Sequence, residues 1–437
     1  MSSADTSLDP TARPASPVPR PAPRTSLLET SRLVALMCCC AVLFVIFRVM
    51  QAVPELGASK VVVDFDAFYI TGQLIWEGRL TDAYDPAVTM ELQSALASTT
   101  VFMPWTYPPQ FDLVVALLPL ASRGLAYGIF MTLGFAFFLY PLSRLAGRYA
   151  PAVLIAAVPA LCFNTFVGQN GFFSAGLLGV TALWWLRGKD RAGLPLGLMI
   201  IKPHLAVTMG LFALAAPRWR VVAWAAAMVF LTSLLATIAF GPEVWRAFLD
   251  GTAAAKGNLA QGSYPLYRMT SVFAAVKSLG FGAGAALLAH LAVAFAALAT
   301  VVWLARFSGW APRRTLGFTL LLSLVISPYS YDYDTTIMAM GLAVLAPDLV
   351  NGGRPGERAL LLALAWATGG AGMCMTLFAR GEGMRYGIDW FPLSVGAYVY
   401  LPLIALVWLI LARLQAEERA PLAARGAPAG QASRHAE

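Results

Sequence analysis

The sequence predicts an all-α fold, a polytopic transmembrane helical bundle of about twelve spans. Of its 437 residues, 59% are hydrophobic and only 12% are charged, whereas a soluble globular chain carries about a quarter charged residues. Apolar blocks also recur along most of the length, and only helices and closed barrels can cross a bilayer. This composition excludes a soluble enzyme, a disordered protein and a disulfide-stabilised scaffold.

Each long apolar block is interpreted as one helix that crosses a bilayer core about 30 Å thick. Residues 110–121 form a further block that is too short to cross as a straight helix. Residues 192–216 carry Lys202 and Pro203 in their middle, so we expect a broken or re-entrant helix there. From these blocks we expect ten to thirteen crossings, with twelve preferred. The candidate spans are residues 34–53, 124–143, 150–164, 168–187, 192–216, 220–241, 284–306, 313–328, 333–350, 359–378 and 394–412.

The charge distribution orients these spans. Segment 54–109 holds seven acidic residues against two basic ones, which predicts a long first extracytoplasmic loop. Basic residues instead gather in short connections between apolar blocks, and such connections face the cytoplasm. The net charge of +8 therefore reflects membrane topology, and we expect no nucleic-acid partner. The basic connections are residues 144–148, 187–191, 218–220, 306–314 and 354–358.

The chain divides into one membrane domain, residues 32–413, and two tails. Residues 1–31 and 414–437 are rich in Pro, Ala, Ser and Arg, which predicts disordered segments. The orientation places both tails in the cytoplasm. We expect a multi-pass membrane protein, with membrane lipid as an obligatory partner.

Asp64, soon after the first span, is the candidate for proton chemistry. A carboxylate at the bilayer surface can be reached by both a lipid headgroup and a polar acceptor, and partial burial raises its pKa towards that of a general base. The alternative is that Asp64 and Asp66 solvate a loop or cap the next helix. The residues alone leave both interpretations open.

Lys202 is the clearest charge within an apolar block. An ionisable group inside a span indicates function by default, and an ammonium suits a phosphate or pyrophosphate. His204 follows two residues later and could orient a hydroxyl or a phosphate. The alternative is that Lys202 extends to the interface and meets water.

Further polar residues fall at the same outer face. They suit a hydroxyl-rich ligand such as a sugar, although an interfacial aromatic belt, helix caps and polar turns use the same residue types. The sequence lacks a Walker loop, a dinucleotide fingerprint and a metal-ligand spacing, so we expect no metal and no cofactor. The candidates for sugar or acceptor binding are Asp66, Tyr69, Tyr107, Gln169, Asn170, Tyr331, Asp332 and Asp334.

Read in order, these motifs resemble glycosyltransferase family 87, the polyprenol-phosphate-mannose-dependent α-mannosyltransferase-like family with the C-type membrane glycosyltransferase fold. The resemblance covers about residue 60 to residue 350. Its motifs are Asp64-Phe65-x-x-Phe68-Tyr69, Gly78, Ala83-Tyr84-Asp85-Pro86, Tyr107-Pro108-Pro109, Gly168-Gln169-Asn170, Lys202-Pro203, Ser327-Pro328-Tyr329 and Asp332-Tyr333-Asp334.

The resemblance implies transfer of a hexose, typically mannose, from a polyprenyl-phosphate-linked donor to a lipid-linked or glycan acceptor outside the membrane. Asp64 matches the general base of such enzymes, and Lys202 with His204 would bind the donor phosphate. Transfer would invert the anomeric centre and need no metal. Some relatives use a histidine near the Ser-Pro segment, where this chain has Tyr331 and aspartates. The role of that histidine therefore stays unassigned in this chain.

Two other function classes also fit a polytopic membrane protein. A transporter or flippase for a lipid-linked sugar or anionic solute would show internal repeats and charges near the membrane midplane. The sequence shows no repeat, and its polar residues gather at one face. A polysaccharide polymerase or ligase typically depends on a large later extracellular loop, whereas here the first loop is the rich one. The transferase is therefore preferred, with the transporter as the alternative.

Overall fold

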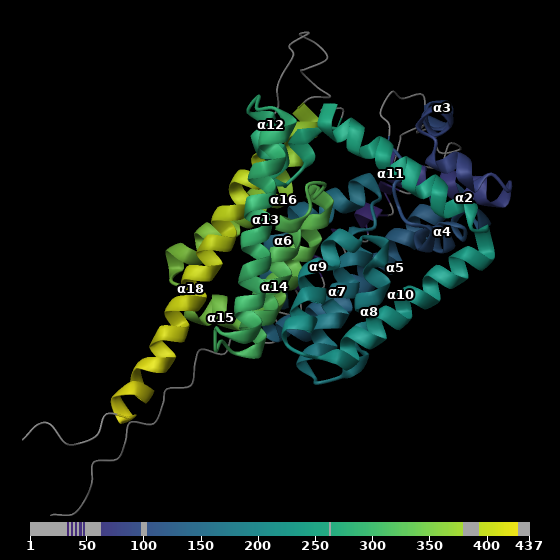
Figure 1. Ribbon diagram of the computed structural model, residues 1–437. Helices are drawn as coiled ribbons and strands as arrows, with labels where there is room; N and C mark the ends of the chain where they lie inside the picture. The colour runs from purple at the N-terminus through teal and green to yellow at the C-terminus, as the bar shows by residue number, and fades with distance from the viewer. Residues whose placement is uncertain are drawn as a thin grey trace, which may run out of the picture.

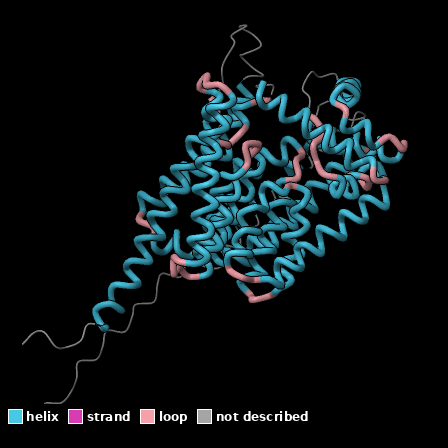
Figure 2. The backbone as a smooth tube through the Cα atoms, viewed as in Figure 1, coloured by secondary structure: helices cyan, strands magenta, loops and turns pink. Residues whose placement is uncertain are grey.

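The computed structural model describes residues 63–97, 103–261, 264–378 and 393–426, together with parts of 33–48. Across these residues the chain is helical, with short loops and no strand (Figure 2), and one isolated bridge pairs Met269 with Tyr331. The predicted all-α class is therefore confirmed. The predicted tail 1–31 and most of the connection 379–393 lie outside the described residues.

Helices cover the apolar blocks and also much of the described part of segment 54–109, which was predicted as a loop. Figure 1 shows their arrangement. Short 3-10 turns cap or join them, of which four matter below: η6 (Met199–Ile201), η5 (Asp190–Ala192), η7 (Leu266–Arg268) and η8 (Asp332–Thr335). The α-helices are α2 (Val63–Trp76), α3 (Pro86–Ala97), α4 (Pro109–Val115), α5 (Arg123–Ala146), α6 (Ala150–Val167), α7 (Gly171–Leu186), α8 (Gly193–Leu198), α9 (Pro203–Ala215), α10 (Trp219–Phe240), α11 (Glu243–Gln261), α12 (Val272–Ser278), α13 (Ala283–Arg306), α14 (Pro312–Ile326), α15 (Thr336–Gly352), α16 (Pro355–Phe378) and α18 (Val395–Gly426).

Six helical segments are long and apolar enough to cross a membrane among the described residues. The chain is therefore a membrane protein, but the predicted count of about twelve spans is not confirmed. Helices α7 and α9 are apolar yet too short to meet the same length criterion. The six segments are Arg123–Val167, Trp219–Phe240, Ala283–Arg306, Asp332–Gly352, Pro355–Met375 and Val395–Arg419.

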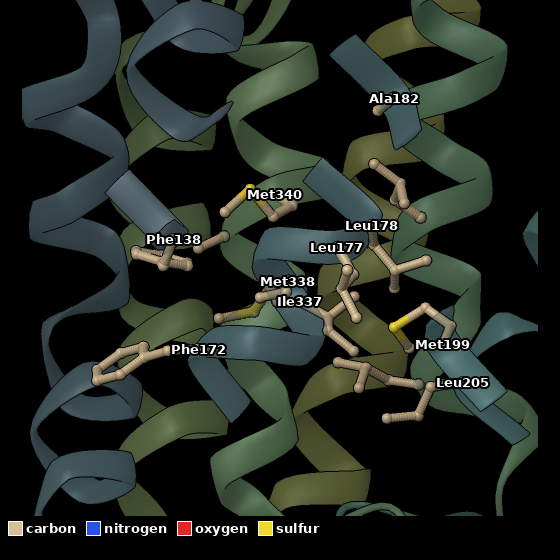
Figure 3. Packing of buried hydrophobic residues seen from close by; sticks show 14 of the residues in the cluster. Phe138, Phe172, Leu177, Leu178, Ala182, Met199, Leu205, Ile337, Met338 and Met340 are labelled. Atoms are coloured by element: carbon tan, nitrogen blue, oxygen red, sulfur yellow. The ribbon is translucent and has the colours of Figure 1, made fainter. Parts of the chain in front are cut away.

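The core lies where α5, α7, α14 and α15 pack together. Ile337, Met338 and Met340 of α15 are fully buried and face a layer that includes Leu177 and Leu178 of α7 (Figure 3). Small residues let the helix axes approach: a Cβ on Gly317 of α14 would lie 2.6 Å from Leu345 of α15. Since lipid offers no hydrophobic driving force between helices, such close packing is what holds the bundle together.

The block 192–216 folds as a broken hairpin, as the sequence predicted. Helix α8 and η6 lead to Lys202, whose φ of −140° and ψ of 70° interrupt the helix before α9 begins at Pro203. The entry end of the hairpin follows directly after α7, which ends at Leu186, while α8 begins at Gly193. The exit end returns to the same place, because the Trp185 ring contacts Phe212 at 5.0 Å and the Arg218 guanidinium at 4.6 Å. The chain therefore returns to the end from which it entered, and we call this segment, residues 193–215 with Lys202 at its tip, the re-entrant hairpin.

The described part of segment 54–109 is helical and lies at one end of the bundle. Helices α2 and α3 lie there beside α11, in the upper part of Figure 1, and α12 lies at the same end. Residues 264–271, with η7, follow α11. Arg268 of η7 contacts Asp64 of α2 and Asp332 of η8, and Lys202 at the tip of the hairpin contacts Asp334 of η8. These segments therefore meet at one place in the fold.

The C-terminal helix extends beyond its predicted end. Residues 414–426, predicted as part of a disordered tail, continue α18 to Gly426. Two guanidinium groups explain the extension: Arg314 Nη2 lies 2.6 Å from Glu418 Oε1, and Arg419 Nη2 donates to the Ser308 carbonyl at 2.9 Å. Residues 427–437 lie outside the described part.

The contact between α8 and α10 can be tested with a pair of glycines. A Cβ on Gly193 would overlap the Val221 carbonyl of α10, whereas a Cβ on Gly210 of α9 meets nothing within 4 Å. We expect Gly193→Val to separate the hairpin from α10 and cost about 1–3 kcal/mol of stability. The midpoint of thermal unfolding in detergent should fall for Gly193→Val and stay within error for Gly210→Ala. An equal response of the two variants would contradict the packing described.

Candidate active site

Asp64 lies in the first turn of α2 and is only 4% exposed. Its Oδ2 atom accepts a 3.4 Å hydrogen bond from Gln169 Nε2 and lies 3.7 Å from Arg268 Nη2. These partners come from the α6–α7 turn and from η7, far away in sequence. The carboxylate predicted to carry proton chemistry therefore lies at a junction of three segments.

Arg268 ends η7 and is held in place by its neighbours in the chain. Met269 forms the isolated bridge with Tyr331, and the Thr270 amide donates to the Ser330 carbonyl at 2.8 Å. Ser394 Oγ, before α18, donates to the Met269 carbonyl at 2.6 Å. Backbone contacts of the two residues that follow Arg268 therefore fix the point from which its side chain extends.

The Arg268 guanidinium is enclosed by aromatic rings. It lies 4.9 Å from the ring centre of Phe163, 5.7 Å from that of Tyr331 and 5.8 Å from that of Tyr333. The two tyrosine rings stack at 5.3 Å. Ring faces attract cations, most strongly where water is excluded, so the rings stabilise a positive charge beside Asp64.

Asp332 contacts the same guanidinium from the other side. Its Oδ2 atom lies 3.4 Å from Arg268 Nε, and the side chain is 1% exposed. A Cβ on Gly372 of α16 would overlap this Oδ2 atom, so only glycine leaves room for the carboxylate there. The absence of a side chain at this position of α16 therefore makes room for the Asp332 carboxylate.

Lys202 and Asp334 form a second buried pair. Nζ lies 2.7 Å from Oδ1, and both side chains are at most 5% exposed. The other oxygen of Asp334 accepts from the Tyr331 amide at 3.2 Å, which caps η8. The ammonium also lies 4.7 Å from the ring centre of Tyr333. The predicted cation is therefore buried and paired, rather than extended to water.

Tyr107 and the Gly168-Gln169-Asn170 turn complete the cluster. The Tyr107 hydroxyl donates to Gln169 Oε1 at 2.8 Å, and the Lys202 ammonium lies 6.0 Å from its ring centre. Gly168 adopts a φ of 70°, the left-handed conformation that ends α6 and turns the chain into α7. The Asn170 side chain is fully buried beside this turn.

The electrostatics of Asp64 suit a base. Burial raises the pKa of its carboxyl above the ordinary value, while Arg268, the hydrogen bond from Gln169 and Lys202 each oppose the rise. A carboxylate with a raised pKa accepts a proton more readily than one in water. The pKa would rise further if a cation withdrew.

Three predicted residues do not join the cluster. Asp66 Oδ1 lies 3.8 Å from Arg123 Nη1 at the start of α5, because residues two apart on a helix face different sides. Tyr69 donates its hydroxyl to the Ala121 carbonyl at 3.0 Å. His204 is half-buried in the first turn of α9, within electrostatic range of Asp334 and Lys202.

Sequence reasoning missed Arg268. This residue lies in an unremarkable loop segment, Tyr264-Pro265-Leu266-Tyr267-Arg268, and no local pattern marks it. Arg48, in the first apolar block, is 6% exposed and donates to the Phe166 carbonyl at 3.2 Å. Within the described ranges, no group of three or more His, Cys, Asp or Glu residues could hold a metal ion.

The sequence profile of glycosyltransferase family 87 matches residues 105–328. The match covers about half of the chain and takes in Tyr107, Gln169, Lys202 and Arg268. The chain belongs to glycosyltransferase family 87. Neither the curated proteins nor the solved structures include a match to it.

Membership in family 87 makes the chain a membrane glycosyltransferase, and the predicted resemblance is confirmed at this level. A glycosyltransferase uses a sugar donor and an acceptor. Asp64 precedes the matched segment, while Asp332 and Asp334 follow it, so the family match and the buried cluster overlap only in part.

The Lys202–Asp334 pair should behave as a buried ion pair. Asp334→Asn leaves the ammonium uncompensated, and we expect a loss of about 3–5 kcal/mol of stability. Adding Lys202→Met removes the stranded charge and should recover part of the loss. Asp190→Asn, which breaks the exposed contact with Arg220, should cost less than about 1 kcal/mol. Thermal unfolding in detergent checks all three, and a double variant no more stable than Asp334→Asn would contradict the pairing.

Proposed function

We propose that this protein transfers a hexose, with mannose as the first candidate, from a polyprenyl-phosphate-linked donor to a lipid-linked or glycan acceptor. The observation that carries the proposal is the buried cluster of Asp64 with two cations and a set of phenols at one end of a membrane bundle. Such a cluster offers a base, anion-binding groups and ring faces within one small volume.

Asp64 acts as the general base in this proposal. The acceptor hydroxyl attacks the anomeric carbon while its proton passes to the Asp64 carboxylate. The bond from the anomeric carbon to the phosphate oxygen breaks, its electron pair leaves with the phosphate, and the configuration inverts. The raised pKa of Asp64 supports this role, because it brings the carboxyl closer to the working pH.

Lys202 and His204 bind the donor phosphate in this proposal. Lys202 lies at the tip of the re-entrant hairpin, and half-helices that meet inside a membrane commonly bind ligands at the break. The ammonium is already paired with Asp334, so the phosphate would share it rather than meet a bare charge. A fixed cation stabilises the charge that develops on the leaving phosphate.

The remaining polar groups bind the sugar and the acceptor. Gln169 and Tyr107 hydrogen bond to each other beside Asp64 and can exchange that bond for sugar hydroxyls. Asn170, Tyr331, Asp332 and Asp334 belong to the same proposed surface, and we retain Asp66 and Tyr69 as outer contacts. The reaction as proposed uses no metal and no cofactor.

The reaction takes place at the extracytoplasmic face of the bacterial inner membrane in this proposal. The acidic first loop and the basic connections at the opposite ends of the spans support this orientation. Both termini then lie in the cytoplasm. A donor carried by lipid suits this face, since nucleotide sugars are cytoplasmic.

The transporter alternative finds less support in the site. A transport pathway needs polar groups distributed across the membrane. In the described chain, Asp64, Arg268, Lys202 and Asp334 gather at one end, and each carboxylate has a cation within 4 Å. This clustering favours chemistry at one face.

The central test compares wild-type protein with Asp64→Asn. Purified protein in detergent receives radiolabelled polyprenyl-phosphate-mannose and a lipid extract of the host. We expect label to move into a new lipid or glycan with wild type, and transfer by Asp64→Asn to fall by about 10²- to 10⁴-fold, the usual contribution of a general base.

The control for this test is Asp82→Asn, which changes an exposed aspartate that contacts Arg79. It should transfer label at the wild-type rate. Gel filtration of all three proteins shows whether the fold is intact. Full activity of Asp64→Asn would move the base elsewhere, and if mannose fails with wild type the assay is repeated with other polyprenyl-phosphate hexoses.

The orientation is tested by cysteine labelling of intact cells, in a background without the five native cysteines. A cysteine in place of Ser94 on α3 should react with a membrane-impermeant maleimide from outside. A cysteine in place of the exposed Gly356, at the start of α16, should react only after lysis. The reverse pattern would invert the proposed topology.

A further inference from the structure

Arg268 has a buried donor that the fold leaves without a hydrogen bond. Its Nη2 atom is shielded from solvent, lies 3.7 Å from Asp64 Oδ2, and has no hydrogen-bond partner among the described residues. A guanidinium normally uses its donors in a planar fork that matches a carboxylate or a phosphate. Here one arm of that fork points into the site, opposite the proposed base.

The two cations of the site differ in how firmly they are held. Lys202 contacts Asp334 at 2.7 Å, a good charge-assisted hydrogen bond. Arg268 instead faces two carboxylates at longer distances, 3.4 Å to Asp332 and 3.7 Å to Asp64. The contact to Asp64 is therefore the weakest of the three and the easiest to exchange for another anion.

The surroundings of Arg268 fix the cation while leaving that contact free to change. Asp332 holds the Nε edge, and the rings of Phe163, Tyr331 and Tyr333 surround the group. The two residues that follow Arg268 are tied by backbone hydrogen bonds to Ser330 and Ser394. A phosphate that displaced Asp64 would meet a guanidinium already oriented to receive it, which keeps the cost of reorganisation low.

We propose that Arg268 is a catalytic residue that binds the donor phosphate and, in the substrate-free site, pairs with Asp64 until the donor arrives. The inference rests on the proposed function and adds a second phosphate ligand to it.

The exchange couples donor binding to base strength. The donor phosphodiester takes the Nη2 arm, Asp64 loses its nearest cation, and its carboxylate becomes a stronger base. It then accepts the acceptor proton as the new bond to the anomeric carbon forms. The electron pair of the broken bond stays on the phosphate, whose second negative charge lies against Arg268. The base is thus weakest when no donor is present.

The test uses Arg268→Gln and Arg268→Lys in the full-length protein, with Arg79→Gln as the matched control. Arg79 is an exposed arginine that contacts Glu77 and Asp82, away from the site. Two quantities are measured for each: the donor KM and kcat in the transfer assay, and the binding of undecaprenyl phosphate, which needs no turnover. Thermal unfolding shows which variants remain folded.

We expect Arg268→Gln to weaken undecaprenyl phosphate binding and kcat/KM for the donor by about 10- to 100-fold, the usual value of a hydrogen bond to a charged group. Arg268→Lys keeps the charge but loses the fork, so it should lie between Arg268→Gln and wild type. Arg79→Gln should match wild type. If Arg268→Gln is poorly folded, Arg268→Lys provides the comparison.

The pH profile gives a readout that a merely structural role would not move. Loss of the Arg268 charge raises the pKa of Asp64 in the free enzyme, so the acid limb of kcat/KM should move to higher pH. Arg268→Lys should shift less. The other titratable or charged groups that face Asp64 are Lys202, Asp332, Tyr107, Tyr331 and Tyr333.

The outcomes separate this inference from the proposed function. If wild type transfers label and Asp64→Asn does not, the transferase stands whatever Arg268 does. In that case the role of Arg268 alone would be overturned if its folded variants bind undecaprenyl phosphate as wild type does and the acid limb of their kcat/KM profile lies at the wild-type pH. Wild type that transfers no sugar from any polyprenyl-phosphate hexose would remove the proposed function, while weaker phosphate binding by Arg268→Gln would still support the binding half of the inference.

Discussion

The need to neutralise buried charge organises this structure. Two cations and three carboxylates lie where water is largely excluded, and a lone charge in such a place is very costly. Arg268 therefore contacts Asp64 and Asp332, while Lys202 contacts Asp334. These partners come from α2, the break between η6 and α9, η7 and η8, so the pairs can form only when four separate parts of the chain converge. The packing that forms the bundle therefore also assembles the site.

Most of the fold could be predicted from the sequence, because lipid imposes a strong rule on every span. The all-α class followed from the apolar blocks. The broken segment followed from Lys202, a charged residue in the middle of one such block. The number of spans did not, since block length cannot tell a crossing helix from a hairpin that returns to the same side. Trp185, which contacts both Phe212 and Arg218, is what reveals the return.

The site could be predicted only in part, for a related reason. Asp64, Lys202 and Asp334 stand out because charges are rare between apolar blocks. Arg268 has no such contrast, since it follows a polar loop and its importance depends on contacts across more than 60 positions in the sequence. Asp66 and Tyr69 share a motif with Asp64 but point elsewhere, because helical geometry turns each residue about 100° from the last. Site residues whose contacts lie far away in the sequence are therefore hard to predict, whatever their residue type.

The re-entrant hairpin has a consequence for how the chain is threaded through the bilayer. Residues 193–215 begin and end at the same end of the bundle. They therefore do not change the side of the membrane on which the next helix begins. Every segment from α10 onward keeps its direction whether or not the hairpin has entered. The position of Lys202 is therefore set by its contact with Asp334 and by the packing of the hairpin, whatever the number of crossings that precede it.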